Sequence, residues 1–94
     1  MELIIKPRAS NAIRKVASYV EEQNTTGSGT RWYDKVIAEI SALAKSKAKL
    51  ALCKNPSLSR FHYRCYTYNE WIIGYRISET KFEVCRFIWG PRLS

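Results

Sequence analysis

The spacing of apolar residues changes once along this chain, and the change determines the order of helices and strands. Between about residues 8 and 44, apolar side chains recur every three or four positions, which is the period of amphipathic helices. After the turn-forming segment at residues 55–57, the apolar period falls to two, which is typical of half-buried strands. A chain of 94 residues is the size of one domain, so we expect a single domain over residues 1–94.

The helical half contains two apolar stripes separated by a break. The first stripe runs over about residues 8–23, and residues 24–29 are rich in turn formers. A second helix should begin near Ser28 or Thr30, because both side chains can cap a helix N-terminus. Two helices joined by such a short loop are typical of an antiparallel helical hairpin, with Trp32 on its core side.

Strands are expected at both ends of the chain. An apolar run at residues 3–5 ends before Pro7, which cannot donate a hydrogen bond to a sheet. Three further strands are expected after the turn, at residues 61–68, 71–77 and 82–88. The stretch over residues 45–59 either extends the second helix or runs irregularly. The predicted order is β-α-α-β-β-β, an α+β fold in which a helical hairpin packs on one face of a mainly antiparallel twisted sheet.

The register of the first two strands after the turn decides where Arg64 points. A loop of only two residues would place Arg64 on the face that carries Ile73 and Tyr75, toward the core. Because burying an unpaired arginine is costly, we expect a loop longer by one residue, or a bulge. The open face of the sheet would then carry these side chains: His62, Arg64, Tyr66 and Arg76. Guanidinium groups beside aromatic rings suit phosphates and bases.

The basic residues are concentrated in the C-terminal half. Residues 1–39 contain six Lys or Arg against five Asp or Glu, a balance of +1, whereas residues 40–94 contain ten against three, a balance of +7. No acidic residue occurs between residues 40 and 69. Such a charge density attracts polyanions, so the expected partner is nucleic acid, a nucleoprotein or an acidic protein segment. The alternative is a basic surface that only keeps the protein soluble.

The cysteines and the N-terminus indicate a reducing compartment. Cys53, Cys65 and Cys85 are odd in number and follow no C-x-x-C spacing. The N-terminus lacks the pattern of a signal peptide, and no apolar run reaches the roughly 20 residues that span a membrane. We therefore expect a cytoplasmic protein with three free thiols in its core. No metal site is expected, because three scattered cysteines and the lone His62 offer too few ligands. No cofactor is expected either.

Several segments together resemble the RelE/ParE superfamily of toxins from bacterial type II toxin–antitoxin modules, which includes plasmid stabilisation proteins. The matching parts are the strand at residues 3–5 leading into residues 7–9, the two helices, Arg60, the strand at residues 75–77 and the ending at residues 86–92. The resemblance covers almost the whole chain. It implies a growth-inhibiting toxin that is neutralised by a cognate acidic antitoxin.

The resemblance implies one of two activities. RelE-like members cut mRNA on the ribosome, and ParE-like members poison DNA gyrase. In the RelE-like pattern an arginine stands three residues before the tyrosine of the middle strand, and the position three residues before Tyr75 is Ile72. Arg92 matches the arginine near the chain end, but the chain stops at Ser94 without the tyrosine or histidine of that branch. These departures favour the ParE-like activity, with an mRNA endoribonuclease or a non-enzymatic nucleic-acid-binding module as the alternatives.

The candidate contacts for a target or an antitoxin are basic residues. They are Arg60, Arg64, Arg76, Arg92, Lys45, Lys47 and Lys49. The alternative is that these residues are solvated charges on an open surface. No catalytic residue is identified, because His62 has no carboxylate close in sequence to orient it as a general base.

Overall fold

The computed structural model of the chain describes residues 2–46, 52–54 and 56–90. Its elements are β1 (Glu2–Ile5), α1 (Pro7–Gln23), α2 (Ser28–Ser46), α3 (Pro56–Ser59), β2 (Arg64–Tyr68), β3 (Trp71–Ile77) and β4 (Lys81–Trp89). This arrangement confirms the predicted order β-α-α-β-β-β. The short helix α3 is an addition, and it lies in the stretch whose structure the sequence left open.

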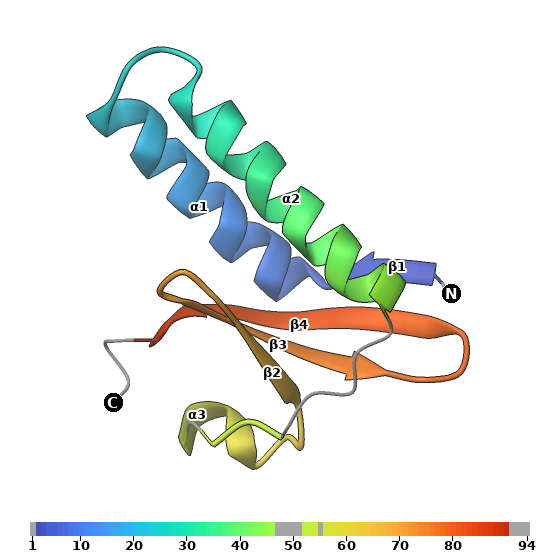
Figure 1. Cartoon of the computed structure of the whole chain (residues 1–94). Helices are drawn as coiled ribbons and strands as arrows, with labels where there is room; N and C mark the ends of the chain where they lie inside the picture. Colours follow the sequence, from blue (N-terminus) through green and yellow to red (C-terminus); the bar gives the residue numbers. More distant parts are fainter. Residues whose placement is uncertain (1, 47–51, 55, 91–94) are drawn as a thin grey trace.

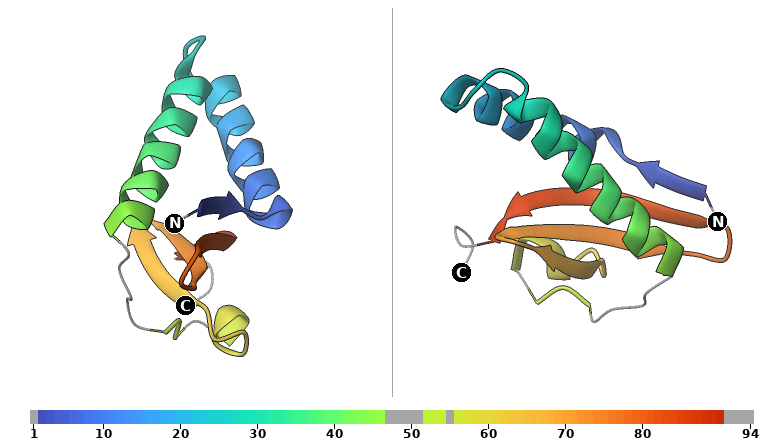
Figure 2. Two further views of the ribbon diagram at one scale, coloured as in Figure 1. Left: turned by 90° about the vertical axis from the view of Figure 1, so that its right-hand side faces the viewer. Right: turned by 45° about the horizontal axis from the view of Figure 1, so that its top comes forward.

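The four strands form one mixed, mostly antiparallel sheet in the order β1-β4-β3-β2. Strand β1 pairs parallel with β4, and the other two pairings are antiparallel. The long helices α1 and α2 lie on one face of the sheet and α3 lies on the other (Figure 1). In the left view of Figure 2, α1 and α2 diverge from their connecting loop toward the sheet. Among the described residues, no helix combines the length and apolarity needed to span a bilayer.

The helical hairpin is closed by Glu21, near the end of α1. Its carboxylate accepts hydrogen bonds from the backbone N–H groups of Gly27 and Gly29, each at 2.8 Å. These bonds satisfy donors at the start of α2 and hold the pKa of Glu21 below its ordinary value. Gly29 also lies so close to α1 that a Cβ there would be 2.4 Å from the carbonyl oxygen of Ala17. The glycine therefore allows the two helices to meet.

The main core lies between the helical hairpin and the sheet. Tyr75 on β3 and Phe82 on β4 are fully buried, and their rings stack with centroids 4.6 Å apart. Trp32 on α2 packs edge-on against Trp71, at a centroid distance of 6.3 Å, which confirms its predicted place in the core. Trp89, at the end of β4, lies tilted against Trp71 at 5.8 Å and remains 41% exposed. Large rings thus supply much of the buried area in a short chain.

The register of β2 and β3 differs from the predicted one. Tyr68 lies opposite Trp71, so the connecting loop is only Asn69 and Glu70, and Arg64 lies opposite Tyr75 on the helix-covered face. Asn69 adopts a φ of 53°, a left-handed conformation that asparagine tolerates better than most residues. The predicted shift is wrong because Arg64 is the first residue of an edge strand and stays half-buried. The full cost of burying its charge is therefore not incurred.

A bulge does occur, but between β3 and β4. Gly74 pairs with Arg86 while Tyr75 pairs with Val84, which leaves Cys85 as the extra residue on β4. Cys85 belongs to a second cluster of buried residues, on the face opposite the helical hairpin. The bulge therefore lets both Arg86 and Cys85 face the α3 side of the sheet.

The face expected to be open is partly covered. We call residues 58–63 the strap, because this segment runs from the last two residues of α3 across the second face of the sheet. Its Leu58 is fully buried and Tyr63 is 8% exposed. Both pack over Gly74, where an added Cβ would lie 3.5 Å from Leu58 Cδ1 and from Tyr63 Cδ2. The prediction of an open sheet face is therefore wrong where the strap crosses it.

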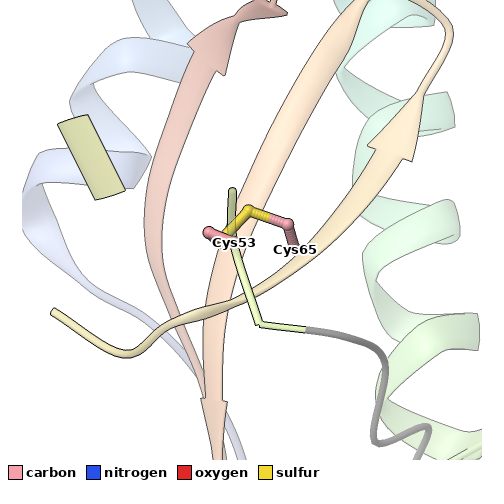
Figure 3. Close-up of a disulfide and its surroundings, with 2 residues drawn as sticks. All are labelled: Cys53 and Cys65. Carbon is pink, nitrogen blue, oxygen red and sulfur yellow. A yellow bond between two sulfur atoms is a disulfide. The ribbon is translucent and has the colours of Figure 1, made fainter. Parts of the chain in front are cut away.

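A disulfide joins Cys53, before α3, to Cys65 on β2, with their Cα atoms 5.0 Å apart (Figure 3). The prediction of three free thiols is wrong for this pair. Cys85 is free and buried, as expected, and burial raises the pKa of its thiol. The two cysteines meet because the strap brings the chain back beside the segment that contains Cys53. Spacing in the sequence carries no sign of that return.

Candidate anion-binding surface

Three arginines gather around two aromatic rings on the second face of the sheet. The Cζ atoms of Arg60 and Arg86 lie 4.8 and 5.3 Å from the centroid of the Phe61 ring. The Cζ atom of Arg76 lies 4.8 Å from the centroid of the Tyr63 ring. The two rings are themselves stacked, with centroids 5.3 Å apart. We call these five residues the arginine–aromatic cluster.

Three separate segments supply the cluster. Arg60 and both rings come from the strap, Arg76 comes from β3, and Arg86 comes from β4 beyond the bulge. The sheet residue between them is Gly74, whose missing side chain leaves room for Tyr63. A Cβ at this position would touch Leu58, Tyr63 and Arg86 at ordinary contact distances, so the strap packs directly on the backbone of β3.

Backbone hydrogen bonds set the course of the strap. The N–H of Phe61 donates to the carbonyl of Leu58, and the N–H of His62 donates to the carbonyl of Ser59, each at 3.1 Å. His62 has a φ of 58°, which reverses the chain between the two rings. The N–H of Cys53 then donates to the carbonyl of Tyr63 at 2.8 Å. The end of the strap is thus tied to the residue that forms the disulfide.

Stacking on the rings restricts the guanidinium groups without neutralising them. A cation over an aromatic face gains about 0.5–2 kcal/mol, depending on its exposure. The edge of a guanidinium group carries its N–H donors, in a fork that matches carboxylate and phosphate oxygens. Arg60 and Arg76 are exposed and Arg86 is half-buried. Within the described ranges, none of the three forms an ion pair with a carboxylate.

The acidic group closest to the cluster along the sheet already has a partner. Glu83 lies opposite Arg76 in the pairing of β3 with β4. Its carboxylate instead forms an ion pair with Lys6, at 3.3 Å. The cluster therefore keeps a net positive charge, and it can bind an anion by charge-assisted hydrogen bonds.

The structure brings together only some of the basic residues that the sequence singled out. Arg60 and Arg76 both belong to the cluster. Arg64 lies on the opposite, helix-covered face of the sheet, where Tyr66 of the same strand donates a hydrogen bond to Glu39 on α2. Lys45 is exposed in the last turn of α2, on the helical side of the sheet. The remaining predicted contacts lie outside the described residues: Lys47, Lys49 and Arg92.

Sequence reasoning missed Arg86 and the roles of the two rings. Strand alternation alone could have suggested that Arg86 shares a face with Ile88, which packs against the second cluster of buried residues. The bulge at Cys85 hides the relation between Arg86 and Arg76, because it breaks the alternation between them. The ring of Phe61 supports two guanidinium groups, a role that strand alternation does not indicate.

The arrangement offers binding groups and no assembled catalytic set among the described residues. Tyr75, from which the RelE-like arginine position is counted, is fully buried against Phe82 and cannot reach a substrate. Ile72, at that arginine position, packs against the second cluster of buried residues. His62 is exposed, and no hydrogen bond joins it to a described carboxylate. The described residues also contain no group of three potential metal ligands.

A hollow of about 800 Å³ at the tip of the helical hairpin is a weaker candidate for a functional site. It is open, and it is lined by residues from the end of α1 and the start of α2. Its carboxylate Glu21 already accepts the two backbone N–H bonds that close the hairpin. The hollow therefore follows from the way the two helices are joined.

No protein-family model matches the chain, and no curated protein matches it at a significant level. The fold, the charge distribution and the arginine–aromatic cluster are therefore the features that bear on function.

Proposed function

We propose that this protein is the growth-inhibiting toxin of a type II toxin–antitoxin module of the RelE/ParE superfamily, neutralised by a cognate acidic antitoxin. One observation carries the proposal. A β-α-α-β-β-β domain presents three arginines, held by two stacked rings, on the sheet face opposite its helical hairpin. This surface has the charge and the donor geometry to bind carboxylates of an antitoxin or an acidic surface of a target.

The distribution of charge supports an anionic partner. The balance of +7 over residues 40–94 places the excess on the half of the chain that builds the strap and the antiparallel strands. An acidic antitoxin would be drawn to this half and would cover the cluster. Covering the cluster would prevent the binding of any target that contacts the same arginines.

The burial of the central tyrosine supports a target other than mRNA. Cleavage of RNA needs exposed groups that move protons and stabilise a charged phosphorane. Tyr75 is buried, and Ile72 has no charge to offer. We therefore propose the ParE-like activity, with DNA gyrase as the target, and place the toxin in the cytoplasm.

A nucleic-acid-binding module without toxicity is the second candidate. It is favoured by the same cluster, because arginines beside stacked rings also bind single-stranded nucleic acid. The two candidates differ in one outcome: a binding module should bind oligonucleotides with a steep salt dependence and should leave growth unaffected.

Inducible expression of the chain, with and without the acidic protein encoded beside it, tests the proposal. Expression alone should arrest growth, and co-expression of the neighbour should restore it. Broken DNA and an induced DNA-damage response would support gyrase as the target. Codon-periodic cuts in mRNA would instead support the RelE-like activity. A chain that is harmless alone would overturn the toxin proposal altogether.

A further inference from the structure

We propose that the Cys53–Cys65 disulfide is a thiol-exchange site that controls the arginine–aromatic cluster. In the oxidised protein the bond holds the strap on the sheet. In the reduced protein the strap detaches and takes Arg60 and both rings away from Arg76 and Arg86. What the cluster binds rests on the proposed function, whereas the release of the strap does not depend on it.

The position of the bond makes this control possible. Cys53 and Cys65 are 12 residues apart, and the loop that they close contains the whole strap. Figure 3 shows the bond linking the segment before α3 to β2, directly beyond the end of the strap. Three of the five residues in the cluster therefore lie inside the closed loop.

Apart from the disulfide, the strap is held on the sheet by two buried side chains and by the contacts of its rings with Arg76 and Arg86. Leu58 is its only fully buried side chain among the described residues, and Tyr63 is the next most buried. Two backbone contacts join the segment before α3 to the chain at the end of the strap. The N–H of Cys53 donates to the carbonyl of Tyr63, the last residue of the strap. An isolated bridge pairs Leu52 with Arg64, at the start of β2. Both act at the same place as the disulfide. Reduction of the disulfide therefore also weakens the backbone hydrogen bond and the bridge beside it.

Loop closure sets the size of the effect. A bond that closes a loop of this length lowers the chain entropy of the open state and so raises its free energy by about 3 kcal/mol. Converted at about 1.4 kcal/mol per factor of ten, this corresponds to an upper limit near a hundredfold change in strap opening.

Exposure indicates which sulfur is attacked. Cys53 is 5% exposed, whereas Cys65 on the edge strand is half-buried. The thiolate of a small thiol such as glutathione attacks Sγ of Cys65 and forms a mixed disulfide there. The S–S bond between the two cysteines breaks, and Cys53 leaves as a thiolate that takes up a proton.

A second thiol completes the reduction. Its thiolate attacks the glutathione sulfur of the mixed disulfide and forms oxidised glutathione. Cys65 leaves as a thiolate and takes up a proton. Two thiols thus supply the two electrons and two protons that convert the disulfide to two thiols.

The third cysteine does not compete in this exchange. Cys85 is buried in the cluster that also contains Cys53, and burial raises the pKa of its thiol. It therefore stays protonated and unreactive at neutral pH. This difference makes Cys85 a suitable control position.

The proposed cytoplasmic location gives the exchange a role. Disulfides in reducing compartments are usually transient or redox-sensing, because cellular thiols reduce them. A toxin whose affinity for an acidic partner falls about tenfold on reduction would still act in the cytoplasm, and it would act more strongly under oxidative conditions. The same bond in an oxidising compartment would simply stay closed.

Hydrogen exchange on the unmodified protein, with and without excess glutathione, tests the release of the strap. In the glutathione-treated protein the amides of Cys53, Phe61 and His62 should exchange about ten to a hundred times faster, because their hydrogen bonds belong to the strap. The amide of Lys6, which donates to Val84 in the parallel pairing of β1 with β4, should be unaffected. The variant Cys53→Ser should behave like the reduced protein, and Cys85→Ser should still respond to glutathione.

Three results would overturn the proposal. Glutathione could fail to reduce the bond, the strap amides could exchange at one rate in both states, or the Lys6 amide could accelerate equally. The last result would show that the disulfide stabilises the whole fold rather than the strap alone.

A second measurement tests control of the cluster. A polyglutamate peptide should bind the oxidised protein about ten times more tightly than the reduced protein, since release of the strap removes one arginine and the ring support of the others. Equal binding of the peptide in both states would overturn the control of the cluster. Accelerated strap exchange with no peptide binding in either state would overturn both the control and the proposed role of the cluster, while leaving the release of the strap established.

Discussion

The guanidinium of Arg76 on β3 lies over the ring of Tyr63 in the strap, with Cζ 4.8 Å from the ring centroid. This contact joins the antiparallel sheet to the strap, whose residues 61–63 were expected to lie in a strand that in fact begins at Arg64. It holds the charge of Arg76 at a defined position on the surface. The contact between these two residues is the centre of the proposed binding surface.

Loss of the sheet arginines should weaken binding and the proposed toxicity together. We expect Arg76→Ala and Arg86→Ala each to reduce affinity for an acidic partner about ten- to a hundredfold, because each removes a charge-assisted bond of about 1.5–3 kcal/mol. Calorimetric titration with a polyglutamate peptide measures the affinity, and plating efficiency after induction measures the toxicity. The matched control is Lys35→Ala, which removes one exposed charge from α2 on the other side of the sheet. An equal loss in the control variant would show that overall charge, rather than the cluster, attracts the partner.

Substitution of Gly29 should destabilise the helical hairpin. A Cβ at this position would lie 2.4 Å from the carbonyl oxygen of Ala17 and 2.9 Å from Cβ of Glu21. We therefore expect Gly29→Ala to lower the free energy of unfolding by about 1–3 kcal/mol, as overpacking does. Urea denaturation measures the difference. Thr30→Ala, at an exposed neighbouring position, should change stability far less.

Acid should weaken the same hairpin through Glu21. Its pKa is lowered in the folded state because its carboxylate accepts the N–H groups of Gly27 and Gly29. A carboxyl group with a lowered folded pKa contributes stability above its unfolded pKa, and this contribution is lost as the pH falls through the folded pKa. Thermal unfolding between neutral pH and the acidic range should show this loss in the unmodified protein. The loss should be smaller in Glu21→Gln.

The control for that experiment is Glu22→Gln, at the exposed neighbouring position. It should reproduce the pH dependence of the unmodified protein. If the two glutamine variants behave alike, the carboxylate of Glu21 does not close the hairpin as described.

The hydrogen bond from Tyr66 on β2 to Glu39 on α2 should be measurable by titration. This bond raises the pKa of the Tyr66 phenol, with a smaller contribution from burial. A raised folded pKa means that the stabilising contribution is present below the unfolded pKa and is lost as the pH rises through the folded value. Ultraviolet titration should show a phenol that ionises later than an ordinary one and that is missing from the titration of Tyr66→Phe. That signal should revert in Glu39→Gln.

Removal of the same bond should also cost stability. We expect Tyr66→Phe to lower the free energy of unfolding by about 1 kcal/mol, because the carboxylate of Glu39 loses a donor at the boundary between helix and sheet. Chemical denaturation measures this change. The control Tyr19→Phe alters a phenol that is 62% exposed on α1 and should be close to neutral. A neutral result for Tyr66→Phe would indicate that water replaces the lost bond at no cost.

The sequence by itself determined the order of the elements and the composition of the main core. The 3.6-residue period yielded both long helices, and the period of two yielded the three antiparallel strands. Trp32 fell correctly on the buried side of α2. These features depend on interactions between residues close in the chain, and periodicity records such interactions directly.

Only the tertiary structure decided the register, the disulfide and the second face of the sheet. The side of the sheet on which Arg64 lies depends on whether the first residue of the edge strand stays exposed to solvent. No local sequence pattern indicates that exposure. Cys53 met Cys65, and Arg60 met Arg86, because α3 and the strap return across the sheet and a bulge turns Arg86 toward them. Each of these approaches joins segments distant in sequence. The close packing of whole elements selects such approaches, because local propensity leaves them undetermined.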